Sequence, residues 1–199
     1  MSSIEAFILV GGQSRRMGTD KAGLRLNGHS FVERIAGEVS GVTASVTIVG
    51  SNAAALQLKE SSNLKIVPDV YPHWGALGGV HAALAACSAT WALIVACDFP
   101  FVTRELFARL ASVREGFDAV APIQSDSIPQ PLCALYRVEP CLGRAMELIE
   151  SGERKPIALL QSVITRWILF SELADLEDSN SLFDNINTPQ DYARIAERS

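Results

Sequence analysis

Short, continuous apolar runs alternate along the chain with longer segments in which apolar residues recur every three or four positions. The first pattern is typical of buried strands and the second of amphipathic helices, so the chain predicts a series of βα units. Such units build a mostly parallel sheet with helices on both faces. The predicted fold class is therefore α/β, a three-layer sandwich around a mostly parallel, Rossmann-like central sheet. The predicted strands are residues 4–10, 45–49, 64–67, 91–96, 119–122, 132–136 and 166–170.

Local capping signals place several of the predicted helices. Ser30 and Glu33 have the spacing of a capping box, in which two side chains close hydrogen bonds of the first turn, and they predict a helix to about Ser40. Thr103 and Thr188 have the chemistry of N-caps for the helices that follow them. The polar, proline-containing segment 125–131 predicts a long loop. The further predicted helices are residues 53–59, 77–86, 104–113, 138–151 and 189–197.

Composition narrows the class of protein. A chain of 199 residues buries roughly 70% of the surface that its unfolded form exposes, which suits one domain. Hydrophobic residues make up 48% and charged residues 20%, as in an ordinary globular protein. The formal net charge is −5 and the sequence contains no run of Lys and Arg, so nucleic acid is not an expected partner.

The cysteines and the apolar segments bear on where the protein works. Cys87, Cys97, Cys133 and Cys141 have the spacing of neither a zinc site nor a disulfide scaffold, so we expect reduced and mostly buried thiols. No charged and apolar leader precedes Ile4, and no apolar stretch reaches the ~18 residues needed to span a bilayer. We therefore expect a cytoplasmic protein with no membrane partner.

A glycine-rich segment follows the first predicted strand and reads Gly-Gly-Gln-Ser-Arg-Arg-Met-Gly-Thr-Asp-Lys over residues 11–21. Its glycines let the backbone curl around a ligand with N–H groups pointing inward, which suits phosphate. Arg16 offers a planar, forked cation to phosphate oxygens, and Lys21 a compact one. The glycine spacing matches neither the dinucleotide-binding fingerprint nor the P-loop. In an acidic chain, this segment predicts a site for one small anion.

Asp98 follows the apolar run 91–96, and ligands in open α/β sheets bind beyond the carboxyl ends of the strands. Magnesium prefers oxygen ligands and is commonly held by one or two carboxylates together with substrate phosphates. A turn or helix-capping aspartate is the structural alternative, but the glycine-rich segment at the same edge favours metal binding. If the bound anion is a phosphate that is transferred, catalysis rests on positioning and charge neutralisation, and Arg16, Lys21 and Asp98 are the predicted catalytic residues.

The glycine-rich segment resembles the N-terminal signature of the molybdenum cofactor guanylyltransferases. These enzymes belong to a larger group of nucleotidyltransferases that includes sugar-phosphate and molybdenum cofactor cytidylyltransferases. The resemblance extends over nearly the whole chain. The other segments that carry it are Pro68-Asp69, Gly75 to Gly79, Cys97-Asp98-Phe99-Pro100, Gly152-Glu153-Arg154 and Asn185-Ile186-Asn187-Thr188-Pro189.

The resemblance implies an activity and a domain organisation. The fold would be of the nucleotide-diphospho-sugar transferase type, as a single domain over residues 1–199 with a nucleotide-binding half (about 1–100) and an acceptor-binding half (about 101–199). The reaction would join GMP from GTP to the terminal phosphate of molybdenum-loaded molybdopterin, release pyrophosphate and require Mg²⁺. GTP and molybdopterin would be the partners, with transient contacts to cofactor-delivery proteins.

The resemblance also implies roles for the residues of the first loop. Leu9, Val10 and Gly11 would contact the base and the ribose of the nucleotide. Gly12 would leave room for the edge of a purine. Lys21 would bind the phosphates.

Four residues outside that loop complete the implied site. Asp69 would add a contact to the guanine nucleotide, and Asp98 would contact the nucleotide and hold Mg²⁺. Asn185 and Asn187 would lie on the acceptor side, where their amides can hydrogen-bond a pterin, a phosphate or a metal-bound water. An ordinary turn before a Thr-Pro helix start explains these two asparagines equally well.

The sequence departs from the family pattern at three places. Val10 stands where alanine is usual, and residues 75–79 read Gly-Ala-Leu-Gly-Gly where Gly-Pro-Leu-Ala-Gly is commoner. Gly50 aligns with the asparagine that follows the family's second strand, and Asn52 is a candidate substitute for it. The first two are exchanges of small apolar residues, whereas the third removes a side chain.

Two other functions remain open at this point. The chain could be a nucleotidyltransferase of the same fold that uses CTP or a sugar-phosphate acceptor, although the pair Gly11-Gly12 favours GTP because cytidylyltransferase relatives usually read Leu-Ala-Ala-Gly here. It could also be a non-catalytic nucleotide-binding module. The presence of Arg16, Lys21 and Asp98 favours the enzyme.

Overall fold

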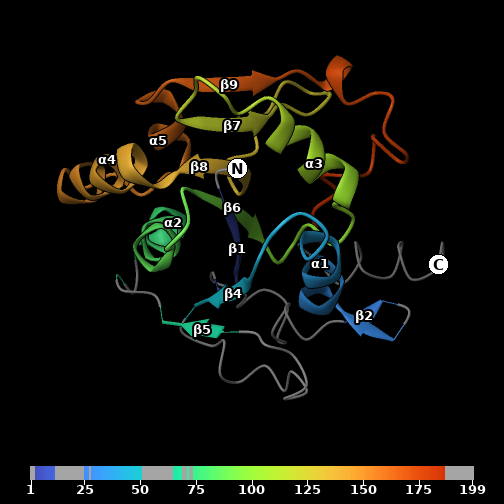
Figure 1. Ribbon diagram of the computed structural model, residues 1–199, viewed down its shortest axis with the longest axis horizontal. Helices are drawn as coiled ribbons and strands as arrows, with labels where there is room; N and C mark the ends of the chain where they lie inside the picture. The colour runs from blue at the N-terminus through green and yellow to red at the C-terminus, as the bar shows by residue number, and fades with distance from the viewer. Residues whose placement is uncertain are drawn as a thin grey trace.

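The computed structural model describes residues 3–11, 25–26, 28–50, 65–68, 71 and 74–186. Its centre is a seven-stranded sheet with the order β5-β4-β1-β6-β8-β7-β9 (Figure 1). Neighbouring strands pair in parallel except at β8, which is antiparallel to β6 and to β7. The predicted mostly parallel sheet is therefore confirmed. The strands are β1 (Ile4–Leu9), β4 (Val46–Val49), β5 (Lys65–Val67), β6 (Trp91–Ala96), β7 (Ala119–Pro122), β8 (Cys133–Arg137) and β9 (Thr165–Ile168).

Helices cover both faces of the sheet and make three layers (Figure 1). Side chains alternate along β1, so Ala6 and Ile8 pack into one core while Phe7 and Leu9 pack into the other. The first core is shared with α1 (Phe31–Val39) and α3 (Arg104–Ser112), and the second with α2, α4 and α5. The helices of the second face are α2 (Gly75–Ala86), α4 (Val138–Glu150) and α5 (Ile157–Gln161).

The capping signals at Ser30 and Thr103 act as the sequence predicts, whereas Thr188 lies outside the described residues. The Ser30 hydroxyl accepts from the backbone N–H of Glu33 at 3.2 Å, and the Glu33 carboxylate accepts from the N–H of Ser30 at 2.7 Å. Thr103 accepts from the N–H of Leu106 at 3.3 Å and begins α3. Each bond satisfies a backbone donor that the first helical turn leaves without a partner.

Some predicted element boundaries are wrong, and three short elements were not predicted from the sequence. The last strand ends at Ile168 rather than at 170, because a 3₁₀ helix (Phe170–Glu172) begins there. The second-face helix α2 begins at Gly75, two residues before the predicted start. The helix α5 and the two-residue strands β2 (Arg25–Leu26) and β3 (His29–Ser30) are too short to give a periodic signal. The predicted helices at 53–59 and 189–197 lie outside the described residues.

The predicted loop 125–131 is the connection between the antiparallel neighbours β7 and β8. The N–H of Gln124 donates to the carbonyl of Ile128 at 3.1 Å, and the Asp126 carboxylate accepts from the N–H of Ile128 at 3.0 Å. Ser127 adopts a positive φ of 68° at the turn. The segment is therefore a folded turn at the end of a β-hairpin.

All four cysteines are described, and all are free thiols. Cys97, Cys133 and Cys141 are buried and Cys87 is half-buried, which confirms the prediction of reduced, mostly buried side chains. Burial raises the pKa of Cys87 and of Cys141 to about 12. Burial therefore disfavours the thiolate, which is the reactive form of a cysteine, at both positions.

Within the described residues, no helix is both long enough and apolar enough to cross a membrane. The division of the chain into a nucleotide-binding and an acceptor-binding half stays a prediction.

Candidate functional site

The carboxyl ends of three parallel strands meet at one edge of the sheet. Leu9 at the end of β1 lies in register with Val49 of β4 and with Ala96 of β6. Backbone hydrogen bonds continue past the strands: Val10 N–H donates to the carbonyl of Val49 at 2.8 Å, and Cys97 N–H donates to that of Leu9 at 3.0 Å. The edge therefore carries the start of the glycine-rich segment and the residue before Asp98 on one rigid frame.

Gly50 permits a close approach between the ends of β1 and β4. Its φ is +153°, and a Cβ atom placed on it would lie 1.7 Å from the carbonyl oxygen of Val10. No side chain fits at that distance. The backbone thus accounts for the departure from the family pattern, because an asparagine cannot occupy this position without moving Val10. The candidate substitute Asn52 lies outside the described residues.

Asp98 stands just beyond β6, half-buried, and is held by the C-terminal segment. The side-chain amide of Asn185 faces only acceptors on Asp98, so its nitrogen is the atom that points there. In that orientation it donates to Oδ2 of Asp98 at 3.1 Å and to the Asp98 carbonyl oxygen at 3.2 Å. The same carbonyl accepts from the N–H of Ile186 at 3.4 Å. Two site residues predicted separately from the sequence are therefore in direct contact.

The side chain of Ile186 anchors this contact. It is fully buried in a small apolar cluster with Leu26, Phe31 and the half-buried Phe101. The cluster joins the β2–β3 hairpin, α1 and the loop after Asp98 to the C-terminal segment. Neither hydrophobic period nor spacing signals this packing, because its members come from three distant parts of the chain.

The beginning of α2 lies against the turn that follows α4. The N–H of Leu77 donates to the carbonyl of Arg154 at 3.3 Å, and the Arg154 guanidinium lies 5.5 Å from the centre of the Trp74 ring. Glu153 accepts from the N–H groups of Lys155 and Arg154, and these bonds lower the pKa of its carboxyl. The structure thus brings together two segments that carry the family resemblance, residues 75–79 and 152–154.

Tight packing ties α2 to the nucleotide edge as well. A Cβ atom on Gly79 would lie 3.4 Å from Cδ1 of Leu9, which is ordinary van der Waals contact. Helix α2 therefore packs directly against the end of β1 at this position.

Several predicted site residues are not placed by the structure. Five of the predicted site residues are described and lie at the carboxyl edge of the sheet or contact it: Leu9, Val10, Gly11, Asp98 and Asn185. The others lie outside the described residues, and their roles stay predictions: Gly12, Arg16, Lys21, Asp69 and Asn187.

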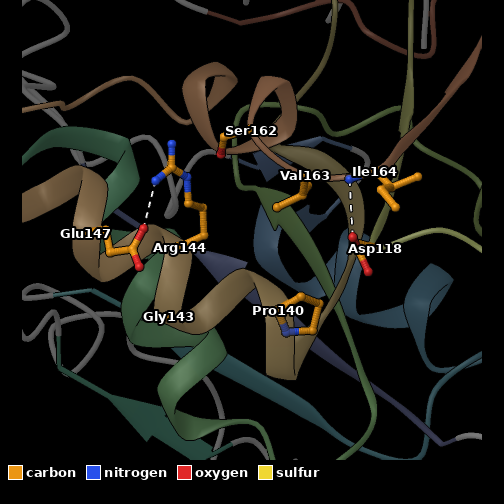
Figure 2. Close-up of a pocket in the computed structure, with 8 residues that line it drawn as sticks. All are labelled: Asp118, Pro140, Gly143, Arg144, Glu147, Ser162, Val163 and Ile164. Carbon is orange, nitrogen blue, oxygen red and sulfur yellow. Dashed lines mark hydrogen bonds and ion pairs between the residues drawn. The ribbon is translucent and has the colours of Figure 1, made fainter.

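A hollow lies away from this edge, between α4 and the segment that leads into β9. Figure 2 shows Pro140 and Gly143 on one side of it and Val163 and Ile164 on the other. Asp118, which accepts from the N–H of Ile164 at 3.2 Å, precedes β7. The hollow is therefore at the amino end of β7 and β9, opposite to the edge that holds Asp98.

Gly143→Ala is expected to stabilise the protein by about 0.5–1 kcal/mol. Gly143 lies inside α4, is exposed, and a Cβ atom there would meet no atom within 4 Å. Alanine has the higher helix propensity and restricts the unfolded chain. Urea unfolding measures the change. Gly78→Ala is the matched control inside α2: its Cβ would lie 3.1 Å from the Tyr71 carbonyl oxygen, so no gain is expected. Equal gains at both positions would contradict the packing argument.

Comparison with known families shows to which proteins this chain is similar. The sequence profile described as MobA-like NTP transferase domain matches residues 6–166, most of the chain. The chain belongs to this family. It is a nucleotidyltransferase, and the predicted resemblance to the molybdenum cofactor guanylyltransferases is confirmed.

Two curated relatives match over nearly their whole length. The probable molybdenum cofactor guanylyltransferase of Pelotomaculum thermopropionicum is 35% identical over 188 residues, which cover 94% of this chain and 89% of the relative. The molybdenum cofactor guanylyltransferase of Vibrio atlanticus is 32% identical over 191 residues, with 94% and 93% covered.

Solved structures agree on the fold. Molybdopterin-guanine dinucleotide biosynthesis protein A of Archaeoglobus fulgidus has a TM-score of 0.81 at 27% identity, covering 98% of this chain and 97% of its own. The 4-diphosphocytidyl-2C-methyl-D-erythritol synthase of Anaerococcus prevotii has a TM-score of 0.71 at 14% identity, with 99% and 98% covered. The second likeness concerns the fold alone. Together they confirm the nucleotidyltransferase type of α/β sandwich.

Proposed function

We propose that this protein transfers GMP from GTP to the terminal phosphate of molybdenum-loaded molybdopterin and releases pyrophosphate, in the cytoplasm and with Mg²⁺ as cofactor. The observation that carries the proposal is the shared edge: the N–H of Cys97, the residue before Asp98, donates to the carbonyl of Leu9, two residues before the glycine-rich segment. The names of the curated relatives support GTP as donor and the molybdenum cofactor as acceptor.

The donor set around Asp98 fits magnesium. Among the described residues there is no cluster of three or more His, Cys, Asp and Glu side chains that would build a complete metal cage. A single carboxylate is sufficient when substrate phosphates and waters supply most of the ligands, as is common for Mg²⁺. Bound there through Asp98, Mg²⁺ would neutralise charge on the triphosphate.

The chain's own residues would do the rest by positioning and charge. Leu9, Val10 and Gly11 would present backbone groups to the base and ribose at the rigid end of β1. Arg16 and Lys21 would bind triphosphate oxygens and stabilise the charge that accumulates as the acceptor phosphate attacks the α-phosphorus. The acceptor phosphate is already ionised at neutral pH, so the reaction needs little help from a general base.

Turnover with defined substrates tests the proposal. Purified protein is incubated with Mg²⁺, molybdenum-loaded molybdopterin and each of the four nucleoside triphosphates in turn, and pyrophosphate release is followed. We expect release with GTP and at most slow release with the others. Preference for CTP would overturn the guanylyl assignment, and nucleotide binding without any pyrophosphate would overturn the enzymatic one. Release that persists when EDTA replaces Mg²⁺ would overturn the cofactor.

A further inference from the structure

We propose that Asn185 is a positioning residue that fixes the orientation of the Asp98 carboxylate toward the divalent cation of the nucleotide complex, through the amide N–H groups that face Asp98. The inference rests on the metal role proposed for Asp98. It assigns Asn185 to the metal side of the site, whereas the sequence resemblance placed this asparagine on the acceptor side.

The hydrogen bonds of Asn185 have the geometry that positioning requires. One amide nitrogen donates to Oδ2 of Asp98 at 3.1 Å and to the Asp98 carbonyl oxygen at 3.2 Å. A carboxylate otherwise rotates freely about its last side-chain bond, because that torsion has broad minima. A hydrogen-bond donor on one oxygen fixes the plane of the carboxylate. It therefore also fixes the direction in which the second oxygen points.

The segment that carries Asn185 is itself firmly held. Ile186 is fully buried, and its N–H reaches the same carbonyl of Asp98 at 3.4 Å. Phe183 packs edge-on against Phe99, with ring centres 6.3 Å apart, and both rings are almost fully buried. Phe183 and Ile186, on either side of Asn185 in the sequence, are thus held by two apolar contacts, the first with Phe99 and the second with the cluster of Leu26, Phe31 and Phe101. The amide is therefore held in place before any ligand arrives.

Side chains that hydrogen-bond to a metal ligand orient that ligand and so affect the affinity of the metal site. Loss of such a partner typically costs 10–100-fold in metal affinity or activity. Asn185 is exposed, so water can replace part of the lost hydrogen bond, and we expect the lower end of that range. The predicted effect is about tenfold on the metal-dependent part of nucleotide binding.

The experiment measures GTP affinity by calorimetry, once with EDTA and once with Mn²⁺. The quantity compared is the dissociation constant in EDTA divided by the dissociation constant in Mn²⁺. Asn185→Leu should lower this ratio about tenfold and leave the affinity in EDTA unchanged. Asn180→Leu is the matched control, since Asn180 is exposed in the same C-terminal segment and no change is expected. Asn185→Ala repeats the test if the leucine variant does not fold.

A double-mutant cycle separates positioning from direct ligation. If Asn185 acts only through Asp98, Asn185→Leu has no further effect on the ratio in an Asp98→Ala background. The same loss in both backgrounds would show an independent ligand and overturn the inference. An unchanged ratio with a raised KM for molybdopterin would also overturn it, in favour of acceptor binding. A ratio that Asp98→Ala itself leaves unchanged would instead refute the proposed metal role.

Discussion

Asp98→Ala is expected to lower kcat for pyrophosphate release by about 10³-fold or more while leaving the fold intact. Asp98 is the one carboxylate that directly follows β6, and it lies beside the edge where β1 ends. Loss of a single preorganised electrostatic group in an active site typically costs about 10²–10³-fold, and loss of the metal ligand adds to this. Initial-rate kinetics with saturating GTP measure the change.

Asp184→Ala is the matched control for this experiment. Asp184 is exposed in the segment that precedes Asn185, so its replacement removes the same charge near the same edge. We expect near-normal turnover from the control and thermal unfolding of both variants close to that of the wild type. Near-normal turnover of Asp98→Ala, with intact fold, would refute the catalytic assignment of Asp98.

Most of the architecture was predictable from local patterns. The strands β6 and β7 begin and end where the apolar runs do, because every residue of these strands is buried and the runs are continuous. The capping box of α1 was equally predictable, since its two side chains act within one helical turn. The five-residue helix α5 was not, because fewer than two turns give no period.

The candidate site was predictable residue by residue but not as an arrangement. Asp98 could be selected because it ends an apolar run, and the family resemblance gave it a role. Its contact with Asn185 could not be foreseen, because these residues are far apart in the chain and the neighbours of Asn185 read as an ordinary turn. The fully buried Ile186, which anchors the contact, is one apolar residue in a polar stretch and carries no periodic signal.

The constraint on Gly50 also could not be predicted from the sequence. A glycine after a strand is ordinary in sequence, and comparison with the family suggested only a missing asparagine side chain. The structure adds the reason, since the Val10 carbonyl occupies the space where a Cβ atom would stand. The glycine that stands in place of the family's asparagine is therefore a requirement of this backbone.

Gly50→Ala is expected to destabilise the protein by about 2–6 kcal/mol and to weaken GTP binding. The positive φ costs an alanine about 1–3 kcal/mol, and the added methyl group must displace the Val10 carbonyl, which is 1.7 Å away, at a further cost of about 1–3 kcal/mol. Since Val10 begins the proposed base contact, its displacement disturbs the nucleotide site directly. Urea unfolding and GTP titration measure the two effects.

Gly116→Ala separates the steric clash from the backbone strain. Gly116 also has a positive φ, +85°, but a Cβ atom there would meet nothing within 4 Å. We expect this control to lose only the conformational part, about 1–2 kcal/mol, and to bind GTP normally. Gly50→Asn, which introduces the family's residue, should behave like Gly50→Ala or worse. Equal destabilisation of Gly50→Ala and Gly116→Ala would mean that the β1 and β4 ends separate at little cost, and the rigid edge inferred for the nucleotide site would then be wrong.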